Sequence, residues 1–484
     1  MKVRNIYKFC LLFFMFAANS NIYGQDPMSL YFMETIPQLS RINPAMQPRT
    51  NVFVALHSTN LSFSSDLSFN NLAQKDGNNR YTLIENQFDY KKFYNKLGNA
   101  WNIDANSEVN LLGFGFRAGK GYFTFNLSVK ADIQNALPSD IFKITETGLT
   151  ENLDFSPLRQ KTLVYKQASI GYSHEITKKL TLGVNLRPIF GVAALMTDFK
   201  TFDVNTGLDK WELVLKGDVY SSIPTVTVTD RPNDYPEIEA DSEKLDNDYM
   251  EYAKSFSNPG FAADFGAVYK FTDRLTFSAA LNNLGFIKWN DNLNSISADG
   301  NFFFDGMEIN DPDWDSEKYF DELGEEFRTA LNYRTGKKEF STSLTPALYV
   351  GASYHITNTI SAGFLSRSIL QKNGMRQNFS LSANIQPYDF VSFTANLNQN
   401  VRGGTYAGMG FSLFFGPLQV YLLVDGIPLR YSDVTISSQD DYFKSFTMEY
   451  FPTRAKEFTG MLGLNLVFGK KGYRNRPMLD RGIY

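Results

Sequence analysis

The sequence has almost no cysteine and very little histidine. Its one cysteine, Cys10, lies in an N-terminal segment that we expect to be removed, so the mature chain cannot form an internal disulfide. The three histidines, His57, His174 and His355, leave little material for a hydrolase site. Without disulfides, the stability of the fold must come from a core or an extended sheet. With so few histidines, we expect no enzyme activity.

The chain also lacks an excess of positive charge and any long apolar run. The formal net charge is -4, and it becomes -7 without residues 1–24, which carry three positive charges and no negative ones. A mildly acidic balance argues against nucleic acid as a partner. No stretch after residue 24 approaches the roughly 18 apolar residues of a helical span, so a membrane crossing would have to use strands.

The N-terminal residues have the pattern of a secretory signal peptide. Lys2, Arg4 and Lys8 precede an apolar run of about ten residues, which small and polar residues follow. This run is too short to span a bilayer as a helix. We therefore expect residues 1–24 to be cleaved and the protein to be exported to a bacterial cell envelope.

Strands of alternating polarity make up much of the rest. From Phe123 to Ile133 every odd residue is apolar and every even residue is polar, which predicts a strand with one apolar face. The pattern predicts about 14 strands of the length that a tilted membrane strand needs. The other predicted strands lie at residues 51–64, 110–118, 164–176, 179–190, 263–271, 274–283, 347–356, 379–385, 390–397, 407–415, 418–424 and 462–468.

The connections and charges favour a membrane barrel over a soluble sandwich. Short turns alternate with long links, which is typical of outer-membrane barrels with tight periplasmic turns and extended surface loops. The predicted apolar faces hold no charge, whereas the opposite faces carry charges such as Arg187 and Asp264. A sandwich core would also exclude charge, but a sandwich has no reason to sort its loops by length. We predict an all-β, antiparallel transmembrane barrel over residues 51–468, in the outer membrane of a Gram-negative bacterium.

The predicted long loops cover roughly residues 134–163, 192–262, 288–346, 371–378 and 427–458. We expect them to be extracellular, acidic and partly helical. Residues 316–332 predict a helix that packs on the barrel mouth, because apolar side chains recur there at helical spacing, namely Phe320, Leu323, Phe327 and Leu331.

Three motifs resemble cofactor or metal signatures only in part. "GFGFRA", Gly113 to Ala118, is followed by no helix, so crowding in the barrel explains its glycines better than a dinucleotide does. "HEITK" has Lys178 where a zinc-protease motif needs its second histidine, and we place His174 at the membrane interface. Four acidic residues match a calcium loop, but an acidic helix start explains them equally well; they are Asp311, Asp313, Asp315 and Glu322. We expect no cofactor and no metal.

The segment before the first strand reads "DPMSLYFMETIPQLSRINPAMQP" and contains Asn43, Pro44 and Ala45. It resembles an uncharacterised envelope family of Bacteroidota catalogued as domain of unknown function 5723. An Asn-Pro-Ala near the mature N-terminus is also typical of barrels similar to the long-chain fatty-acid transporter, including barrels of type IX secretion. The resemblance implies a barrel with residues 25–50 tucked inside as a hatch, and Asn43, Pro44 and Ala45 as the hatch motif.

Two functions follow as alternatives. The first is a transporter or channel for hydrophobic or small solutes, with outer-membrane lipid and a hydrophobic ligand as partners. The second is a non-transporting envelope subunit that docks or anchors a secretion or assembly protein. A basic tail, residues 469–484, is expected in the periplasm, where its cations could contact an acidic partner or lipid headgroups; these are Lys470, Lys471, Arg474 and Arg476.

Overall fold

The computed structural model describes residues 26–76, 79–82, 88–144, 152–207, 210–230, 237–240, 255–306, 316–371, 374–401, 404–436 and 446–469. The predicted signal peptide and nearly all of the predicted basic tail lie outside these residues, so both stay predictions. No helix among the described residues is long and apolar enough to cross a membrane.

The strands form a closed antiparallel barrel of 14 strands, as predicted. β25 pairs with β1, and the other edge of β1 pairs with β4, which closes the circle. In order around the barrel the strands are β1 (Val52–Ser65), β4 (Ala100–Ala118), β5 (Gly121–Pro138), β7 (Arg159–Glu175), β8 (Leu180–Thr206), β12 (Pro259–Lys270), β13 (Leu275–Trp289), β17 (Ala347–His355), β18 (Ile360–Gln371), β19 (Gly374–Tyr388), β20 (Val391–Asn400), β21 (Gly404–Phe415), β22 (Leu418–Pro428) and β25 (Glu457–Phe468).

The barrel is apolar outside and polar inside. Leu381 of β19 is 63% exposed and Phe393 of β20 is 49% exposed, whereas their inward neighbours Ser382 and Thr394 are buried. A soluble protein buries its apolar face and exposes its polar one. The reversed order is the one expected of strands that cross a membrane, because lipid solvates the outward side chains.

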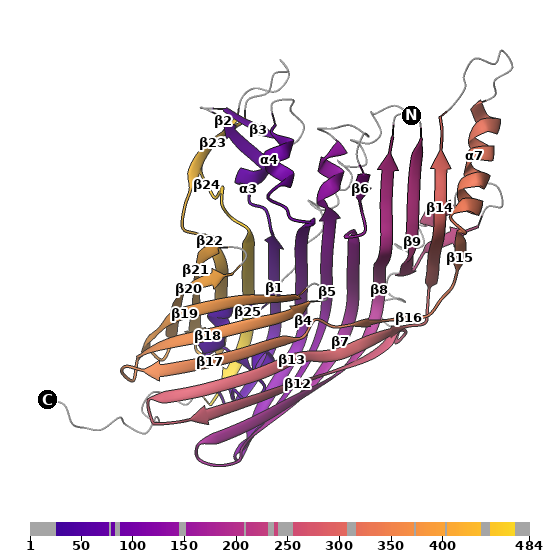
Figure 1. Cartoon of the computed structure of the whole chain (residues 1–484). Helices are drawn as coiled ribbons and strands as arrows, with labels where there is room; N and C mark the ends of the chain where they lie inside the picture. The colour runs from indigo at the N-terminus through magenta and orange to yellow at the C-terminus, as the bar shows by residue number, and fades with distance from the viewer. Residues whose placement is uncertain are drawn as a thin grey trace.

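The two ends of the barrel differ as predicted. At one end the strands join through short turns at residues 119–120, 176–179, 271–274, 356–359, 389–390 and 416–417. The opposite end, which we call the rim, carries the long connections and those described helices that lie outside the lumen (Figure 1). The predicted long link at residues 371–378 was wrong, because β18 runs to Gln371 and β19 already begins at Gly374. Three of the short turns share one hydrogen bond pattern, in which the Oγ1 of Thr177, Thr272 or Thr357 accepts from nearby backbone N–H groups.

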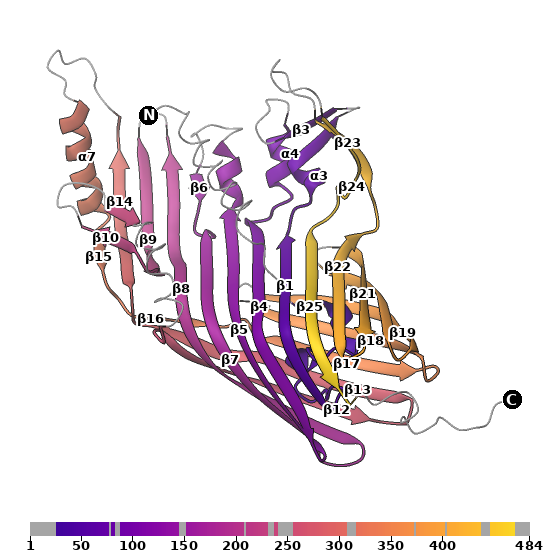
Figure 2. The ribbon, with the colours of Figure 1, turned by 180° about the vertical axis from the view of Figure 1, so that it is seen from behind.

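The rim differs from the prediction on one side. Residues 192–206 and 211–222 are not a loop, because β8 continues upward and returns as β9 (Trp211–Ser222). β9 pairs with β14 (Leu293–Phe304), which pairs with β15 (Arg334–Gly336), so a sheet projects beyond the barrel (Figure 2). We call these four strands the rim sheet.

The helix over residues 316–332 is confirmed as α7 (Ser316–Ala330), but it does not pack on the barrel mouth. Leu323 and Phe327 of α7 pack on the rim sheet, where the rings of Phe327 and Phe302 lie 5.2 Å apart. The predicted position on the barrel mouth was wrong because α7 covers one face of β9 and β14. The spacing of apolar residues predicts a helix, but it does not show which surface the helix covers.

A smaller aromatic cluster stands on the other side of the rim. Phe93 of α4 (Tyr90–Tyr94) meets Phe142 of η3 (Ser139–Phe142) with ring centroids 4.9 Å apart. The remaining elements near the rim are α3 (Phe69–Leu72), β2 (Ala73–Asp76), β3 (Asn79–Thr82), β6 (Asn152–Asp154), β10 (Val226–Thr229), β11 (Glu237–Ala240), β16 (Phe340–Ser343), β23 (Ser432–Ile436) and β24 (Phe446–Phe451).

Candidate functional site

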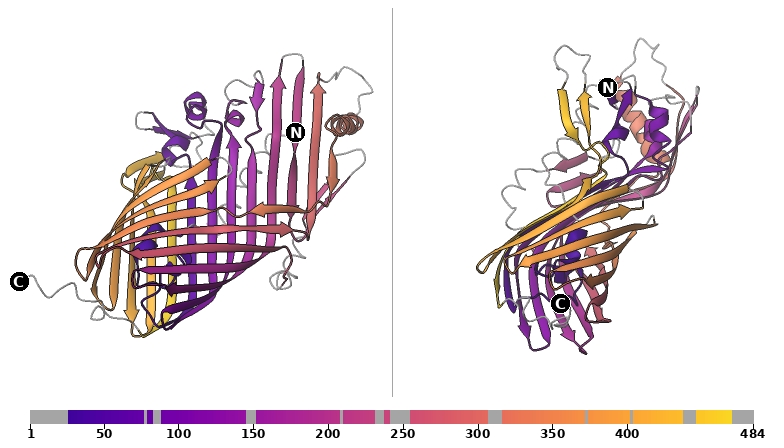
Figure 3. Two further views of the ribbon diagram at one scale, coloured as in Figure 1. Left: turned by 60° about the horizontal axis from the view of Figure 1, so that its bottom comes forward. Right: turned by 90° about the vertical axis from the view of Figure 1, so that its left-hand side faces the viewer.

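Residues 26–50, which we call the plug, lie inside the barrel between its two walls (Figure 3). The plug contains η2 (Met28–Phe32) and α2 (Leu39–Ile42). Leu30, Tyr31 and Ile36 are completely buried. The plug therefore fills the lumen between the polar inner faces of the strands.

An apolar cluster holds the first half of the plug. Tyr31 stacks on Tyr349 of β17, with ring centroids 6.0 Å apart and planes 14° from parallel. The wall residues of this cluster are inward-facing exceptions to the polar lumen, namely Ala280, Ala347, Tyr349, Leu365, Ile369, Tyr421, Leu423 and Met461. Burial of these side chains stabilises the closed plug, at about 25 cal/mol for each Å² removed from water.

The predicted hatch motif lies where the plug meets β8, β12 and β13. The Nδ2 group of Asn43 donates to the carbonyl oxygen of Ala279 at 3.2 Å, and its Oδ1 accepts from the amide of Ala45 at 3.0 Å. Ala45 lies against Gly266, where a Cβ atom would come within 2.7 Å of the Ala45 nitrogen. The strands thus leave room for the motif, whose role as part of a hatch stays a proposal.

A reciprocal amide pair fastens the middle of the plug. Gln38 donates to Asn465 of β25 at 2.7 Å, and Asn465 donates back to Gln38 at 3.0 Å. Asn465 also donates to Gln419 of β22, which in turn donates to the carbonyl oxygen of Thr35 at 2.9 Å. These buried amides are hydrogen-bonded to one another and not to solvent. The plug is therefore specified in one position against β22 and β25.

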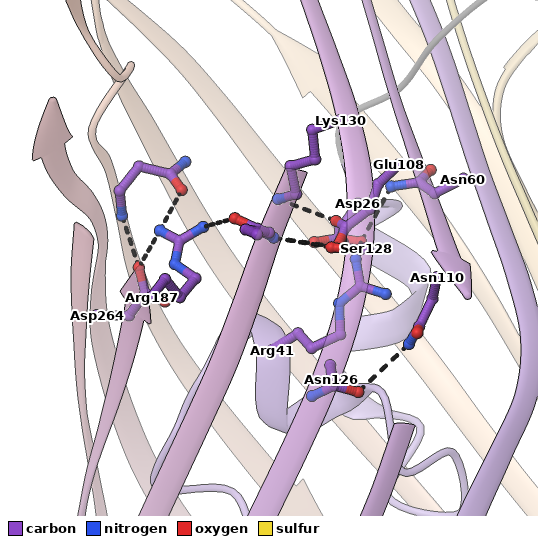
Figure 4. A network of polar contacts seen from close by, with 12 residues as sticks. Asp26, Arg41, Asn60, Glu108, Asn110, Asn126, Ser128, Lys130, Arg187 and Asp264 are labelled. Atoms are coloured by element: carbon purple, nitrogen blue, oxygen red, sulfur yellow. Dashed lines mark hydrogen bonds and ion pairs between the residues drawn. The ribbon is translucent and has the colours of Figure 1, made fainter. Parts of the chain in front are cut away.

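Charged residues tie the plug to one wall (Figure 4). Glu108 of β4 forms ion pairs with Arg41 of the plug and, at 2.9 Å, with Lys130 of β5. Glu108 and Lys130 are partners in the β4–β5 register, so strand pairing alone brings them together. Asp26 lies 3.8 Å from Arg41, and its Oδ1 accepts from Asn60 of β1 at 3.0 Å.

The network continues along the same wall. Gln167 of β7 donates to Ser128 at 3.0 Å and accepts from Arg187 of β8 at 3.1 Å. Arg187 forms an ion pair with Asp264 of β12 at 2.7 Å, with both side chains at most 4% exposed. Both charges point inward, as the alternation predicted.

A second ion pair closes the plug on itself at the end with short turns. Arg49 pairs with Glu34, with its Nε 2.7 Å from the Oε2 of Glu34, and it donates to Gln386 of β19 at 3.1 Å. Burial is the largest single effect on the pKa of Glu34 and raises it, but Arg49, with smaller contributions from His355 and Lys270, outweighs burial, so this pKa lies below its ordinary value of 4.5. The pair therefore contains a charged carboxylate at neutral pH.

Two polar cavities lie above the plug. The inner cavity, of about 110 Å³, is bordered by Arg41, Glu108, Asp132 and Arg187. The mouth cavity, of about 390 Å³, opens toward the rim. Gln134 of β5 lines the mouth cavity and donates to Thr345 at 2.8 Å and to Asp132 at 3.2 Å, two residues of the inner cavity. One amide side chain thus separates the two spaces.

The other candidate residues do not join this site. His174 lies on the outside of β7, where its Nδ1 is 2.9 Å from the Tyr172 hydroxyl. Gly113 and Gly115 face the crowded lumen, since a Cβ at Gly113 would meet Ala55 at 3.2 Å. Asp311, Asp313 and Asp315 lie outside the described residues. Among the described residues, no group of His, Cys, Asp or Glu could hold a metal ion.

The alternation predicts Lys130 on an inward strand face, but no motif in the sequence marks Arg41 or Glu108 as a site residue. The sequence does contain a signal for Glu108, because Glu108 and Lys130 fall on the inward positions of two neighbouring strands joined by a short turn. Only the folded position of the plug brings Arg41 to this pair.

Comparison with known proteins gives a family. The model of the family described as "Family of unknown function (DUF5723)" matches residues 44–425, and the chain belongs to this family. No curated protein matches it. The predicted origin in Bacteroidota stays a prediction.

Among solved structures, a FadL homologue of Pseudomonas aeruginosa is 10% identical with a TM-score of 0.43, over 93% of this chain and 100% of that one. The toluene transporter TbuX of Ralstonia pickettii is 10% identical with a TM-score of 0.41, over 90% of this chain and 94% of that one. The toluene transporter TodX of P. putida is 10% identical with a TM-score of 0.39, over 89% and 94%. At this level of similarity, nothing about a solute follows for this chain.

Proposed function

We propose that this member of a family of unknown function is an outer-membrane barrel that transports small solutes through its lumen, with residues 26–50 as the gate. The outward apolar face supports the membrane location. The sorting of connections supports an orientation with the short turns in the periplasm and the rim outside the cell.

The way the plug is attached carries this proposal. β1 and β25 close the barrel without any residue of the plug. In the described part of the chain, no backbone–backbone hydrogen bond joins residues 26–50 to a barrel strand. The plug can therefore leave its seat by breaking side-chain contacts, and every strand pairing survives.

The lining favours a polar solute. Both cavities above the plug are bordered mainly by charged and amide side chains. Many inward apolar side chains pack against the plug in the cluster around Tyr31, and others pack against one another in a cluster that includes Leu163, Tyr165 and Trp289. A hydrophobic solute, the other class that the sequence predicts, would meet only scattered apolar side chains in the inner cavity, such as Tyr165 and Leu344, among its charged and amide groups.

Solute release from proteoliposomes tests the gate. We expect vesicles with the intact protein to release a trapped small polar solute slowly, and vesicles with a variant that lacks residues 26–48 to release it quickly. The heat-dependent electrophoretic mobility of each protein shows whether the barrel has folded. Equal release from both folded proteins would contradict the gate, whereas selective release of a hydrophobic solute would change the solute class only.

The rim sheet supports the docking alternative. β9, β14 and α7 build a surface beyond the barrel that a pore does not need, and Phe303 is 44% exposed on it. A docking subunit should co-purify with one protein at fixed stoichiometry from its own membrane, and a Phe303→Asp variant should lose that protein. Purification without a partner from that membrane would count against the alternative.

A further inference from the structure

We propose that the mouth cavity binds the carboxylate of a small hydroxylated acid and that Arg159 is its cationic contact. This inference rests on the proposed transport function and names the solute class that enters the barrel first. It depends on one difference among the charged side chains around the mouth cavity: Arg159 has no partner in the described chain, whereas the other charged side chains do.

Four charged side chains line this cavity, and three of them have a partner. Arg376 donates to Asp104 of β4 at 2.8 Å, so these two charges neutralise each other. Asp66 accepts from the Nδ2 group of Asn102 at 2.6 Å and from the Asn102 amide at 3.3 Å. Arg159 is the fourth charged side chain.

The Arg159 side chain makes no hydrogen bond and no ion pair within the described residues. It stands at the first position of β7, opposite Ala136 of β5, at the rim end of the barrel. Asp104 and Asp198 act on it only electrostatically, from beyond ion-pair distance. A half-buried guanidinium with five unused donors is a ready contact for a planar oxyanion.

The charge balance favours a carboxylate over a phosphate. Asp66 and Asp104 offset Arg159 and Arg376, so the wall has no net charge to hold a dianion. A singly charged carboxylate can form two parallel hydrogen bonds with Arg159 while it stays clear of Asp104.

The amides on the cavity wall favour a hydroxylated acid. Asn99, Asn102, Gln134 and Gln371 line the same space and offer both donors and acceptors. Leu97, Ala100, Ala136 and Pro157 are the apolar residues that line it, and none of them is aromatic. Such a wall solvates hydroxyl groups better than hydrocarbon.

The next groups along the wall suit an anion that moves inward. Lys161 follows Arg159 on the same face of β7 and lies opposite Gln134, the residue between the two cavities. Its Nζ donates to the carbonyl oxygen of Ser343 at 2.9 Å, and Asp132 acts on its charge from beyond ion-pair distance. Arg159 and Lys161 thus lie in series on one face of β7, from the rim end inward.

Equilibrium dialysis of the full-length, detergent-solubilised protein tests this site. The probes are galacturonate and galactose, which share ring and hydroxyl groups and differ in the carboxylate, with inorganic phosphate as a competitor. The variants are Arg159→Gln and, as a matched control, Arg334→Gln. Arg334 lies on the rim sheet, where its guanidinium donates to Asn332.

We expect galacturonate to bind at least about tenfold more tightly than galactose, because a charged hydrogen bond pair is worth that factor or more. Arg159→Gln should abolish this preference, and Arg334→Gln should keep it. Equal binding of both sugars, or a preference that survives Arg159→Gln, would overturn the inference. Tighter binding of phosphate than of galacturonate would overturn the carboxylate assignment.

Binding at the mouth does not require an open gate. Galacturonate binding without release from vesicles that contain the plug-deleted barrel would refute transport alone. Release that does not distinguish galacturonate from galactose, together with equal binding, would refute the anion site alone.

Discussion

The substitution Arg41→Met should open the gate while the barrel stays folded. Arg41 is the only cation of the plug that pairs with the wall residue Glu108 among the described residues, and the two side chains are 10% and 5% exposed. Methionine keeps the length and the apolar contacts of the arginine side chain but removes its charge.

The expected cost follows from what remains at Glu108. Breaking a buried ion pair costs about 3–5 kcal/mol when it leaves a charge without compensation. Here Lys130 stays 2.9 Å from Glu108, so the carboxylate keeps one partner. We therefore expect the loss of one charged hydrogen bond, about 2 kcal/mol, which shifts the ratio of closed to open plugs by a factor of about 30.

Single-protein conductance in planar bilayers measures this ratio. The matched control is Lys216→Met, because Lys216 pairs with Asp299 at 2.6 Å on the rim sheet with side chains that are 50% and 60% exposed. An exposed pair of this kind contributes about 0–1 kcal/mol and does not touch the plug. If Arg41→Met opens no more often than Lys216→Met, the reasoning about the wall network is wrong.

Three further predictions concern the seat, the pH dependence and the membrane face. Gly266→Ala should loosen the plug, because the new methyl group would approach the Ala45 nitrogen to 2.7 Å, whereas Gly460→Ala meets only the Phe458 ring at 3.4 Å; amide hydrogen exchange of residues 26–50 should rise in the first variant only. The pKa of Glu34 is lowered in the folded state, so its pair with Arg49 stabilises the plug fully above pH 4.5 and is lost as the pH falls through the lowered pKa. The protection of the amides near residues 34 and 49, relative to their intrinsic exchange at each pH, should therefore fall on acidification, and Glu34→Gln should remove this dependence. Leu381→Arg should destabilise the protein in lipid by about 2–4 kcal/mol. The control Ile238→Arg should cost much less, because Ile238 is equally exposed but lies outside the barrel strands. Equal destabilisation of both variants, measured by urea unfolding in vesicles, would refute the assignment of the membrane face.

The barrel was predictable because lipid and lumen impose opposite requirements on alternate residues. Leu381 and Ser382 are adjacent and face opposite environments. The two-residue period of polar and apolar residues therefore shows directly which side chains face lipid and which face the lumen. The short turns are also local, since each of the three Thr turns is specified by a hydrogen bond pattern among neighbouring residues.

The contacts between plug and wall were not predictable because they join distant segments. Gln38 and Asn465 are 427 positions apart, and neither lies in a recognisable motif. The docking position of α7 was predicted wrongly for a related reason. The helix itself was correctly predicted from its spacing, but the strand residues that it packs on, including Phe302, lie in a segment that was predicted to be a loop. Local patterns specify elements, and long-range packing specifies where they dock.

A reversible crosslink between plug and wall tests the gate most directly. The Oγ1 of Thr35 in the plug lies 2.8 Å from the Oγ of Ser392 in β20, so cysteines at both positions would place their sulfur atoms within bonding reach. The chain's own Cys10 lies in the predicted leader and leaves no competing thiol once that leader is removed. Planar-bilayer conductance of the Thr35→Cys/Ser392→Cys protein is then measured before and after reduction, with each single variant as control. The account predicts that oxidation abolishes opening in the double variant only and that reduction restores it; opening that persists in the oxidised, crosslinked protein would contradict residues 26–50 as the gate.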